Sequence, residues 1–155
     1  MSIGLVAPND EFYAELDRPS LARLAGIRRN RFLQATVLPQ FGRVAHAEAR
    51  LHDMAHMTAS WLRAQEPEAL PIAYDYSIDY ELLEELLQLV DPGLVPQLEP
   101  VHVGYLLEDP DGIAAAEAAW IATEARYGLG RHHALADALA LMARFEAVHG
   151  SSRTR

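Results

Sequence analysis

Two histidines and an aspartate between a glycine-containing loop and an apolar segment are the residues here best suited to chemistry. They lie in Gly128-Leu-Gly-Arg-His-His-Ala-Leu-Ala-Asp137. The apolar residues that follow recur at helical spacing and predict a core-facing stripe: Leu135, Leu139, Met142 and Phe145. Asp137 stands beside that stripe, where an unpaired carboxylate is costly unless it is paired or binds a cation.

The spacing between His132 and Asp137 limits how the two side chains can meet. Five residues at roughly 100° each do not return to the same face of a continuous helix. The imidazole and the carboxylate therefore converge only if His132 lies in the loop and Asp137 in about the first helical turn. Gly128 and Gly130 can supply such a loop. The alternative is a loop-to-helix junction with surface histidines and an exposed acid.

This arrangement, His132-x-x-x-x-Asp137 followed by Ala-Leu-Ala, resembles the last motif of the DEDDh 3'–5' exonuclease superfamily. The resemblance implies that His132 is the general base for the attacking water and that Asp137 is a metal ligand. His133 is a less suitable base, because four residues before Asp137 it is expected inside the helix. Short motifs carry a false-positive risk, so both interpretations of this stretch stay open.

A second candidate site is Asp75-Tyr-Ser-Ile-Asp79-Tyr-Glu-Leu-Leu83, at a predicted junction between a strand and a helix. Such a junction places a carboxylate at the carboxyl edge of a sheet, where open α/β sheets commonly bind ligands. Asp79 could alternatively be a helix N-cap. The pattern also resembles the middle motif of the same superfamily, and this implies that Asp79 is a metal ligand.

The amino-terminal part extends the resemblance to a bacterial exoribonuclease branch. It rests on Ile3-Gly-Leu-Val6, on Glu11-Phe-Tyr-Ala-Glu-Leu16 and on Val37-Leu-Pro39. The family's first motif, Asp-x-Glu on a strand before this hairpin, is absent, and Asp10 and Glu11 in the turn cannot replace it. The resemblance implies an α/β fold with a ribonuclease H-like mixed sheet flanked by helices that lacks its first strand. A missing start is the simpler explanation, and a degenerate relative is the other.

The resemblance also implies a mechanism. Asp79, Asp137 and the missing pair would bind two Mg²⁺ or Mn²⁺ ions, and His132 would deprotonate water, so that nucleotides leave one at a time. The substrate class would be the 3' ends of RNA or single-stranded DNA. Arginines can grip phosphates bidentately, and the expected nucleic-acid contacts are Arg28, Arg29, Arg31 and Arg131. A solvated loop is the alternative for the basic run at 28–31.

Two other groups of residues, which contain different histidines, are alternative candidates for a metal or catalytic site. His52 and His56 have the i, i+4 spacing of a zinc-protease helix, but Asp53 replaces the glutamate that acts as base there. His46 with His52 and Asp53 could imitate an HD-type metal phosphohydrolase. The favoured interpretation is the polar face of an amphipathic helix, with Met54, Met57 and Trp61 in the core.

The composition of the sequence excludes some classes of protein. The 155 residues carry a net charge of −9, which argues against a protein that coats duplexes non-specifically but not against a carboxylate-based nuclease. The sequence has no cysteine, which rules out disulfides and fits a cytoplasmic protein. Long uncharged apolar runs are absent, so no membrane span is expected. A truncated sheet would expose a strand edge, and a homodimer is therefore a hypothesis.

The elements that must position these residues follow from breakers and periodicity. One domain is expected over residues 1–149, with a disordered tail at 150–155. Residues 18–43 are expected to be irregular, with at most a weak helix at 21–24. The predicted order is a hairpin (2–7 and 11–16), a helix (47–64), a strand (70–74), a helix to about residue 90, a weak strand (101–106), a helix (113–127) and a final helix after the glycine-containing loop.

Overall fold

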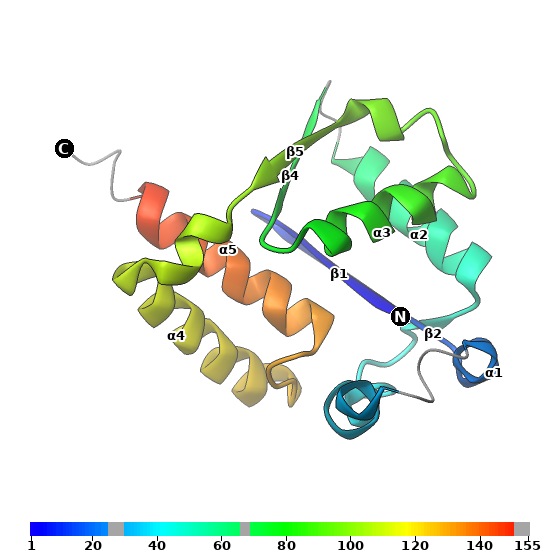
Figure 1. Cartoon of the computed structure of the whole chain (residues 1–155), viewed down its shortest axis with the longest axis horizontal. Helices are drawn as coiled ribbons and strands as arrows, with labels where there is room; N and C mark the ends of the chain where they lie inside the picture. Colours follow the sequence, from blue (N-terminus) through cyan, green and yellow to red (C-terminus); the bar gives the residue numbers. More distant parts are fainter. Residues whose placement is uncertain (25–29, 66–68, 151–155) are drawn as a thin grey trace.

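A tight turn at Pro8 and Asn9 closes the amino-terminal hairpin. The computed structural model describes residues 1–24, 30–65 and 69–150, and Figure 1 shows its course. Strand β1 (Ser2–Ala7) pairs antiparallel with β2 (Asp10–Leu16), from Ser2 opposite Glu15 to Ala7 opposite Asp10. The predicted hairpin is confirmed.

A short parallel strand changes the start of the next helix. The predicted helix 47–64 is wrong at its beginning, because β3 (Glu48–Ala49) pairs with the end of β2 and α2 spans Leu51–Ala64. The amide of Glu15 donates to the carbonyl oxygen of Ala47 at 2.9 Å. The backbone around Ala47 and Ala49 is thus used by the sheet, where both side chains are buried.

Residues 18–43 contain more helix than the breakers indicate. Helix α1 (Arg18–Arg23) is capped by Asp17, whose carboxylate accepts from the amide of Ser20 at 2.8 Å. A helical stretch covers residues 31–40, with wide turns at Leu33–Val37 and a tight turn at Leu38–Gln40. Pro19 and Pro39 sit at the beginnings of turns, where the missing amide is tolerated. Arg28 and Arg29 lie outside the described residues.

A second, two-stranded sheet follows. Strand β4 (Leu70–Tyr74) leads into α3 (Ser77–Gln88), and β5 (Leu98–His102) pairs parallel with β4 from Leu70 opposite Leu98 to Tyr74 opposite His102. The predicted strand 101–106 begins earlier and ends at His102. Tight helical turns flank β5 at Val95–Gln97 and Gly104–Glu108.

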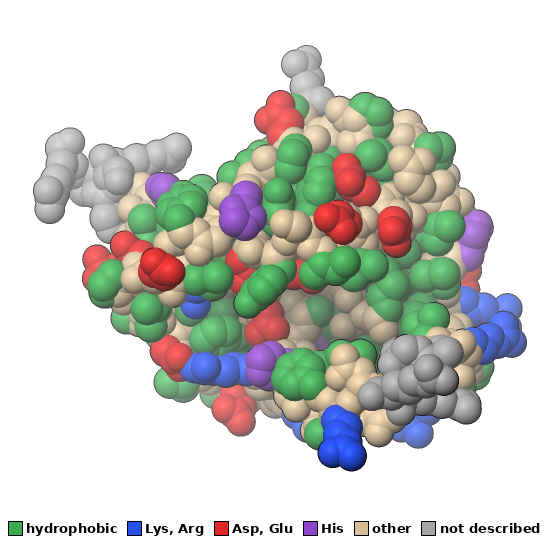
Figure 2. All heavy atoms as spheres, viewed as in Figure 1, with side chains coloured by type: hydrophobic (Ala, Val, Ile, Leu, Met, Phe, Trp, Pro, Cys, Tyr) green, Lys and Arg blue, Asp and Glu red, His purple; other side chains and the backbone are tan. Residues whose placement is uncertain are grey.

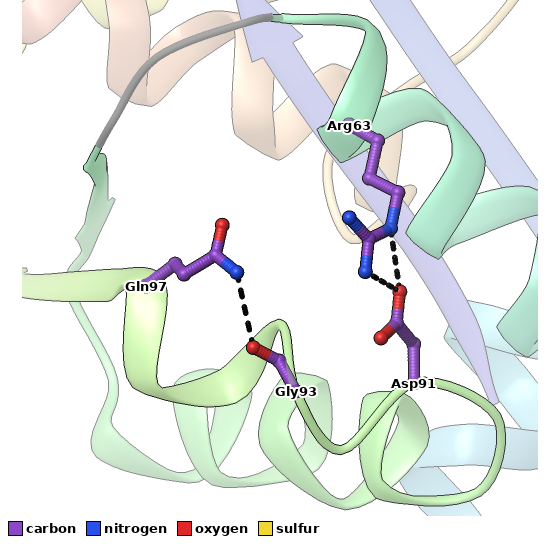
Figure 3. A network of polar contacts seen from close by, with 4 residues as sticks. All are labelled: Arg63, Asp91, Gly93 and Gln97. Atoms are coloured by element: carbon purple, nitrogen blue, oxygen red, sulfur yellow. Dashed lines mark hydrogen bonds and ion pairs between the residues drawn. The ribbon is translucent and has the colours of Figure 1, made fainter.

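Polar contacts hold the connection between α3 and β5. Figure 3 shows Arg63 of α2 paired with Asp91 after α3, with 2.6 Å between the guanidinium and a carboxylate oxygen. In the same view the side-chain amide of Gln97 donates to the carbonyl oxygen of Gly93 at 3.0 Å. These bonds fix the loop over the end of α2.

Two long helices close the chain. Helix α4 (Pro110–Tyr127) and α5 (Ala134–Gly150) lie side by side, and α5 also packs on β1 (Figure 1). Gly128, with φ of +68°, ends α4. Helix α5 runs through Gly150, and the rest of the predicted tail, residues 151–155, lies outside the described residues.

The architecture is mixed α/β, with small open sheets flanked by helices. Side chains of α2 and α3 form much of the core against both sheets, with buried members Met54, Leu62, Leu83, Leu86, Leu87, Leu70 and Leu98. Met57 is 38% exposed, so the prediction that it belongs to the core is wrong. Among the described helices, none is long and apolar enough to cross a membrane.

Candidate functional site

An edge strand of one sheet and an edge strand of the other line a groove, which we call the inter-sheet groove. Strand β1 is the edge of one sheet and β4 is an edge of the other. Two cavities follow the gap between them. The first, of about 340 Å³, is lined by acidic residues and is called the site cavity. The second, of about 440 Å³, has almost entirely apolar walls.

The lining residues give the relative direction of β1 and β4. Residues 1–5 face residues 72–75 across the site cavity, whereas residues 4–8 face residues 70–73 across the apolar cavity. The amino-terminal half of β1 therefore lies opposite the carboxyl end of β4, and the strands run in opposite directions. Figure 2 shows this face of the molecule hollowed, with acidic side chains in and above the hollow.

A glycine brings β1 against the first turn of α5. A Cβ added to Gly4 would lie 2.4 Å from the carbonyl oxygen of Ala134, far inside van der Waals contact. This close approach places Asp137, in the first turn of α5, at the wall of the site cavity. The amino-acid pattern gave no reason to single out Gly4, because a glycine inside a strand only marks a close approach once the neighbour is known.

His132 and Asp137 converge as their spacing predicts. His132 lies in the loop with φ of +67°, and its amide donates to Asp137 Oδ1 at 3.2 Å. The indole of Trp120 donates to the same oxygen at 3.0 Å. Both His132 and Asp137 line the site cavity. The carboxylate is thus held in one orientation by two donors from different elements.

His133 faces the other way. The expectation that it lies inside the helix is wrong, since α5 begins at Ala134. The residue is 2% exposed, and its ring packs on Tyr13 with 4.4 Å between ring centroids. Burial, together with the charge of Arg43, lowers the pKa of His133 to about 4. An imidazole enclosed in this way does not reach the site cavity.

Asp75 and Asp79 form the opposite wall. Asp75 follows β4, and Asp79 lies in the first turn of α3; both line the site cavity. Asp79 is not the N-cap, because Tyr76 occupies that position. Asp75 was not singled out from the sequence as a site residue. The signal for it was present, since it is the first residue after a predicted strand that leads into a helix.

The carboxylates act on one another electrostatically. Partial desolvation raises the pKa of Asp79, and the charges of Asp75 and Asp137 raise it further, although its side chain stays exposed at the cavity wall. Burial likewise raises the pKa of Asp137, while the hydrogen bonds from Trp120 and His132 oppose that shift. Asp75 adds to the rise at Asp137. The negative charges of these three carboxylates therefore lie close enough to repel one another.

Two of the arginines predicted to contact nucleic acid, Arg31 and Arg131, have different surroundings in the structure. Arg31 is exposed at the start of the helical stretch 31–40. Arg131 forms an ion pair with Glu117, and its guanidinium carbon stands 4.2 Å from the ring centre of Trp120. Arg131 therefore buttresses the residue that holds Asp137, and part of its charge is already compensated.

The rival histidines lie away from this cavity. His52, Asp53 and His56 are on the exposed side of α2, where the two imidazole rings meet at 4.6 Å between centroids. His46 is exposed in the loop before β3, with φ of +62°. For His52, Asp53 and His56 this placement agrees with the predicted polar face of an amphipathic helix, whereas His46 lies outside α2.

A third cavity, of about 540 Å³, is formed by the hairpin turn, α4 and α5. Asp10, Glu11 and Glu146 are among its lining residues. Glu11 accepts a hydrogen bond from the hydroxyl of Tyr127 and lies 3.6 Å from the guanidinium of Arg126. Glu11 thus has a cationic partner, whereas none of the ion pairs among residues 1–24, 30–65 and 69–150 involves Asp75, Asp79 or Asp137. We therefore take the smaller cavity as the functional site, because chemistry and not size distinguishes the two.

Carboxylate oxygens are the ligands that Mg²⁺ and Mn²⁺ prefer, so the donor chemistry of the site cavity fits such ions. Within residues 1–24, 30–65 and 69–150, no three acidic or histidine side chains are arranged as a metal-binding group. Comparison with known proteins adds no assignment, since no family model, curated protein or solved structure matches the chain.

Proposed function

We propose a ribonuclease H-like, DEDDh-type 3'–5' exonuclease function for this chain, which would act on RNA or single-stranded DNA ends. The observation that carries the proposal is the convergence of Asp79, Asp137 and His132 on one cavity between two strand edges. These residues come from distant parts of the sequence. Their chemistry, two ligands for hard cations and one base, is that of metal-assisted phosphodiester hydrolysis.

Each residue has a distinct role in this proposal. Asp79 and Asp137, together with the acidic pair of the family's first motif, would hold Mg²⁺ or Mn²⁺, which would supply charge neutralisation at the phosphate and a more acidic water. His132 accepts the proton of the attacking water, and its exposed ring at the cavity wall gives it access to solvent. The amide of His132 and the indole of Trp120 keep Asp137 oriented.

The inter-sheet groove supports the proposal, because the first strand of the exonuclease family could lie in it. A strand running in the direction of β4 would be antiparallel to β1, so it could pair with both edges. Its carboxyl end would reach the site cavity beside Asp75 and the amino-terminal end of β1. Its amino-terminal half would lie between the apolar walls of the other cavity. Acidic residues on such a strand would complete the ligand set.

The test is digestion of a single-stranded oligonucleotide labelled near its 3' end, with Mn²⁺ titrated from zero. It compares this chain with a version extended upstream to the preceding in-frame start. We expect Mn²⁺-dependent release of mononucleotides by the extended version. Asp137→Asn, which keeps an acceptor for Trp120, should reduce the rate at least a hundredfold. Asp111→Asn, an exposed acid in the first turn of α4, is the matched control and should leave the rate unchanged.

Two outcomes would contradict the proposal. Mn²⁺-independent cleavage would exclude the carboxylate site as the source of activity. Absence of cleavage in both versions, with no Asp-x-Glu encoded upstream, would instead favour a non-catalytic relative that binds nucleic acid or protein. A non-catalytic binder should not require Mn²⁺, whereas the proposed exonuclease should. A binding titration with and without the ion therefore distinguishes the binder from the exonuclease.

A further inference from the structure

Two histidines lie about one helical turn apart on the solvent side of α2. His52 is in the first turn of the helix and His56 in the second, and both are exposed. The opposite side of α2 is buried through Met54, Ala55, Thr58, Ala59 and Leu62. Because that side is packed into the core, the backbone of α2 is held in place and the two histidines keep a fixed separation along the helix.

The two imidazole rings are already close to the geometry of a shared metal ion. Their centroids are 4.6 Å apart and their planes are inclined at 70°. Two imidazoles that bind one Zn²⁺ ion through bonds of about 2.0–2.1 Å, at an angle of about 100°, have ring centres roughly 5 Å apart. Small rotations of the side chains of His52 and His56 would therefore allow both rings to bind one ion.

The two rings have no competing polar partner in the part of the chain that the structure describes. Within residues 1–24, 30–65 and 69–150, no hydrogen bond or ion pair involves either imidazole. The charged neighbours in sequence are Asp53 in the first turn and Arg50 at the N-cap, both exposed. Their charges are opposite and screened by solvent, so imidazole coordination and not the local charge decides what binds.

The type of donor atom selects the class of ion. Neutral imidazole suits Zn²⁺, Cu²⁺ and Ni²⁺, whereas Mg²⁺ and Mn²⁺ prefer oxygen atoms such as those of carboxylates. Histidines at positions i and i+4 on one face of a helix are also the spacing with which zinc-protease helices hold Zn²⁺. The histidine pair of α2 and the acids of the site cavity therefore suit different ions.

We propose that His52 and His56 together chelate one Zn²⁺ or similar transition-metal ion on the surface of α2. The inference is independent of the proposed exonuclease function. Water completes the coordination, since in the described ranges no third acidic or histidine side chain is grouped with the pair. The ion ties the first turn of α2 to the second. Because the other side of α2 belongs to the core, binding stabilises the folded protein.

The test is a titration of the protein with Zn²⁺ by isothermal titration calorimetry, in an excess of Mg²⁺ that competes for the carboxylates of the site cavity. We expect one Zn²⁺ ion per chain. His52→Gln or His56→Gln should weaken the affinity at least about tenfold, because a single imidazole cannot chelate. His149→Gln changes an exposed histidine of α5 and is the matched control; it should keep the affinity within about twofold.

A change of spacing separates chelation from independent binding by two histidines. The double variant His52→Gln/Ser60→His again has two histidines at i and i+4 on the exposed side of α2. It should recover the affinity to within about threefold of the wild type. The double variant His56→Gln/Met57→His also has two exposed histidines, but five residues apart they lie about 140° around the helix from each other. It should remain as weak as His56→Gln.

The imidazole signals of the seven histidines in the ¹H–¹³C NMR spectrum give a direct readout. Those of His52 and His56 should shift together and reach their end point at one equivalent of Zn²⁺. Absence of Zn²⁺ binding, an equal loss in His149→Gln, or no recovery in the variant with Ser60→His would overturn the chelate. So would a tenfold loss in His46→Asn, which would make His46 a third ligand. None of these outcomes bears on the carboxylates of the site cavity.

Discussion

The two walls of the site cavity are built differently. On the α5 wall, Asp137 accepts hydrogen bonds from Trp120 and from the amide of His132, and Gly4 lets β1 brace the helix. On the α3 wall, Asp75 and Asp79 project from a strand end and a first helical turn, and mutual repulsion is the main electrostatic influence on Asp79 after desolvation. One wall is preorganised, whereas the other gains most from a bound cation.

This contrast agrees with general experience of metal sites. Ligands that are held by outer hydrogen bonds bind with little reorganisation, while unsupported carboxylates repel each other until charge is neutralised. Trp120 and Arg131 form such an outer layer behind Asp137. The comparison predicts large effects from changes on the α5 wall and small, cation-dependent effects from changes on the α3 wall.

The largest effect is expected from Gly4→Ala. The added Cβ would overlap the backbone of Ala134 and Leu135, which cannot move as a flexible side chain would, so β1 and α5 must separate. We expect a loss of about 3 kcal/mol in the free energy of unfolding, measured by urea denaturation. Gly130→Ala is the control, because nothing lies within 4 Å of its added Cβ, and it should change stability by less than about 0.5 kcal/mol. Equal losses in the two variants would refute the close-approach argument.

A similar effect, which depends on pH, is expected from His133. Its folded pKa of about 4 lies below the ordinary value of about 6.5, so the folded state prefers the neutral ring. The associated stability is fully present above pH 6.5 and decreases as the pH falls towards 4. The total change is about 3 kcal/mol. Urea denaturation at several pH values should show this slope in the wild type and a shallower one in His133→Phe, which keeps the packing on Tyr13. An unchanged slope in the variant would assign the pH dependence to other groups.

A smaller effect is expected from Trp120→Phe, which removes the indole donor to Asp137. The loss should be about 1 kcal/mol in the free energy of unfolding, and the pKa of Asp137 should rise further because one donor to its charged form is gone. Trp61→Phe is the matched control, since it removes a comparable indole bond to Asp10, of 2.7 Å, outside the site. Mn²⁺ affinity, followed by the shift of the unfolding midpoint, should weaken in the first variant and stay constant in the second. A parallel loss of affinity in both would argue against a specific role for Trp120.

The smallest effect is expected from Asp79→Asn without divalent cations. Removing one negative charge relieves repulsion from Asp75 and Asp137, so the variant should be more stable at neutral pH, by less than about 1 kcal/mol at this exposed position. The advantage should shrink as the pH falls and the wild-type carboxyl becomes protonated. Addition of Mn²⁺ should raise the unfolding midpoint of the wild type more than that of the variant. A variant that is less stable than the wild type without cations would show that Asp79 has a structural partner.

Much of the fold could be predicted because the periodic segments agree with the final packing. The hairpin, β4 and the helices α2 to α5 follow from hydrophobic spacing and breakers. The errors lie where tertiary pairing decides local structure. Residues around Glu48 extend the apolar pattern of α2, yet their backbone bonds to β2. The helical stretch 31–40 was hidden by Pro39, which is acceptable there because it begins a tight turn.

Part of the site could also be predicted, because residues that are close in sequence have a limited range of relative positions. His132 and Asp137 are close in sequence, so their spacing alone limits their geometry. The position of Asp75 after a predicted strand was a usable signal, but its charge interactions with Asp79 and Asp137 arise only in the folded chain. Gly4 matters because of what lies opposite it, Ala134, and that information exists only in the folded chain.

The inter-sheet groove also bears on the behaviour of the protein in concentrated solution. The outer edges of β1 and β4 present backbone donors and acceptors along an apolar channel, and within the described residues no strand pairs with them. Such edges are templates for strand addition between molecules. Self-association should therefore rise with concentration, and amide hydrogens along the groove edges of β1 and β4 should exchange with solvent faster than those between β1 and β2. A segment that fills the groove would suppress both and act as an internal safeguard against aggregation.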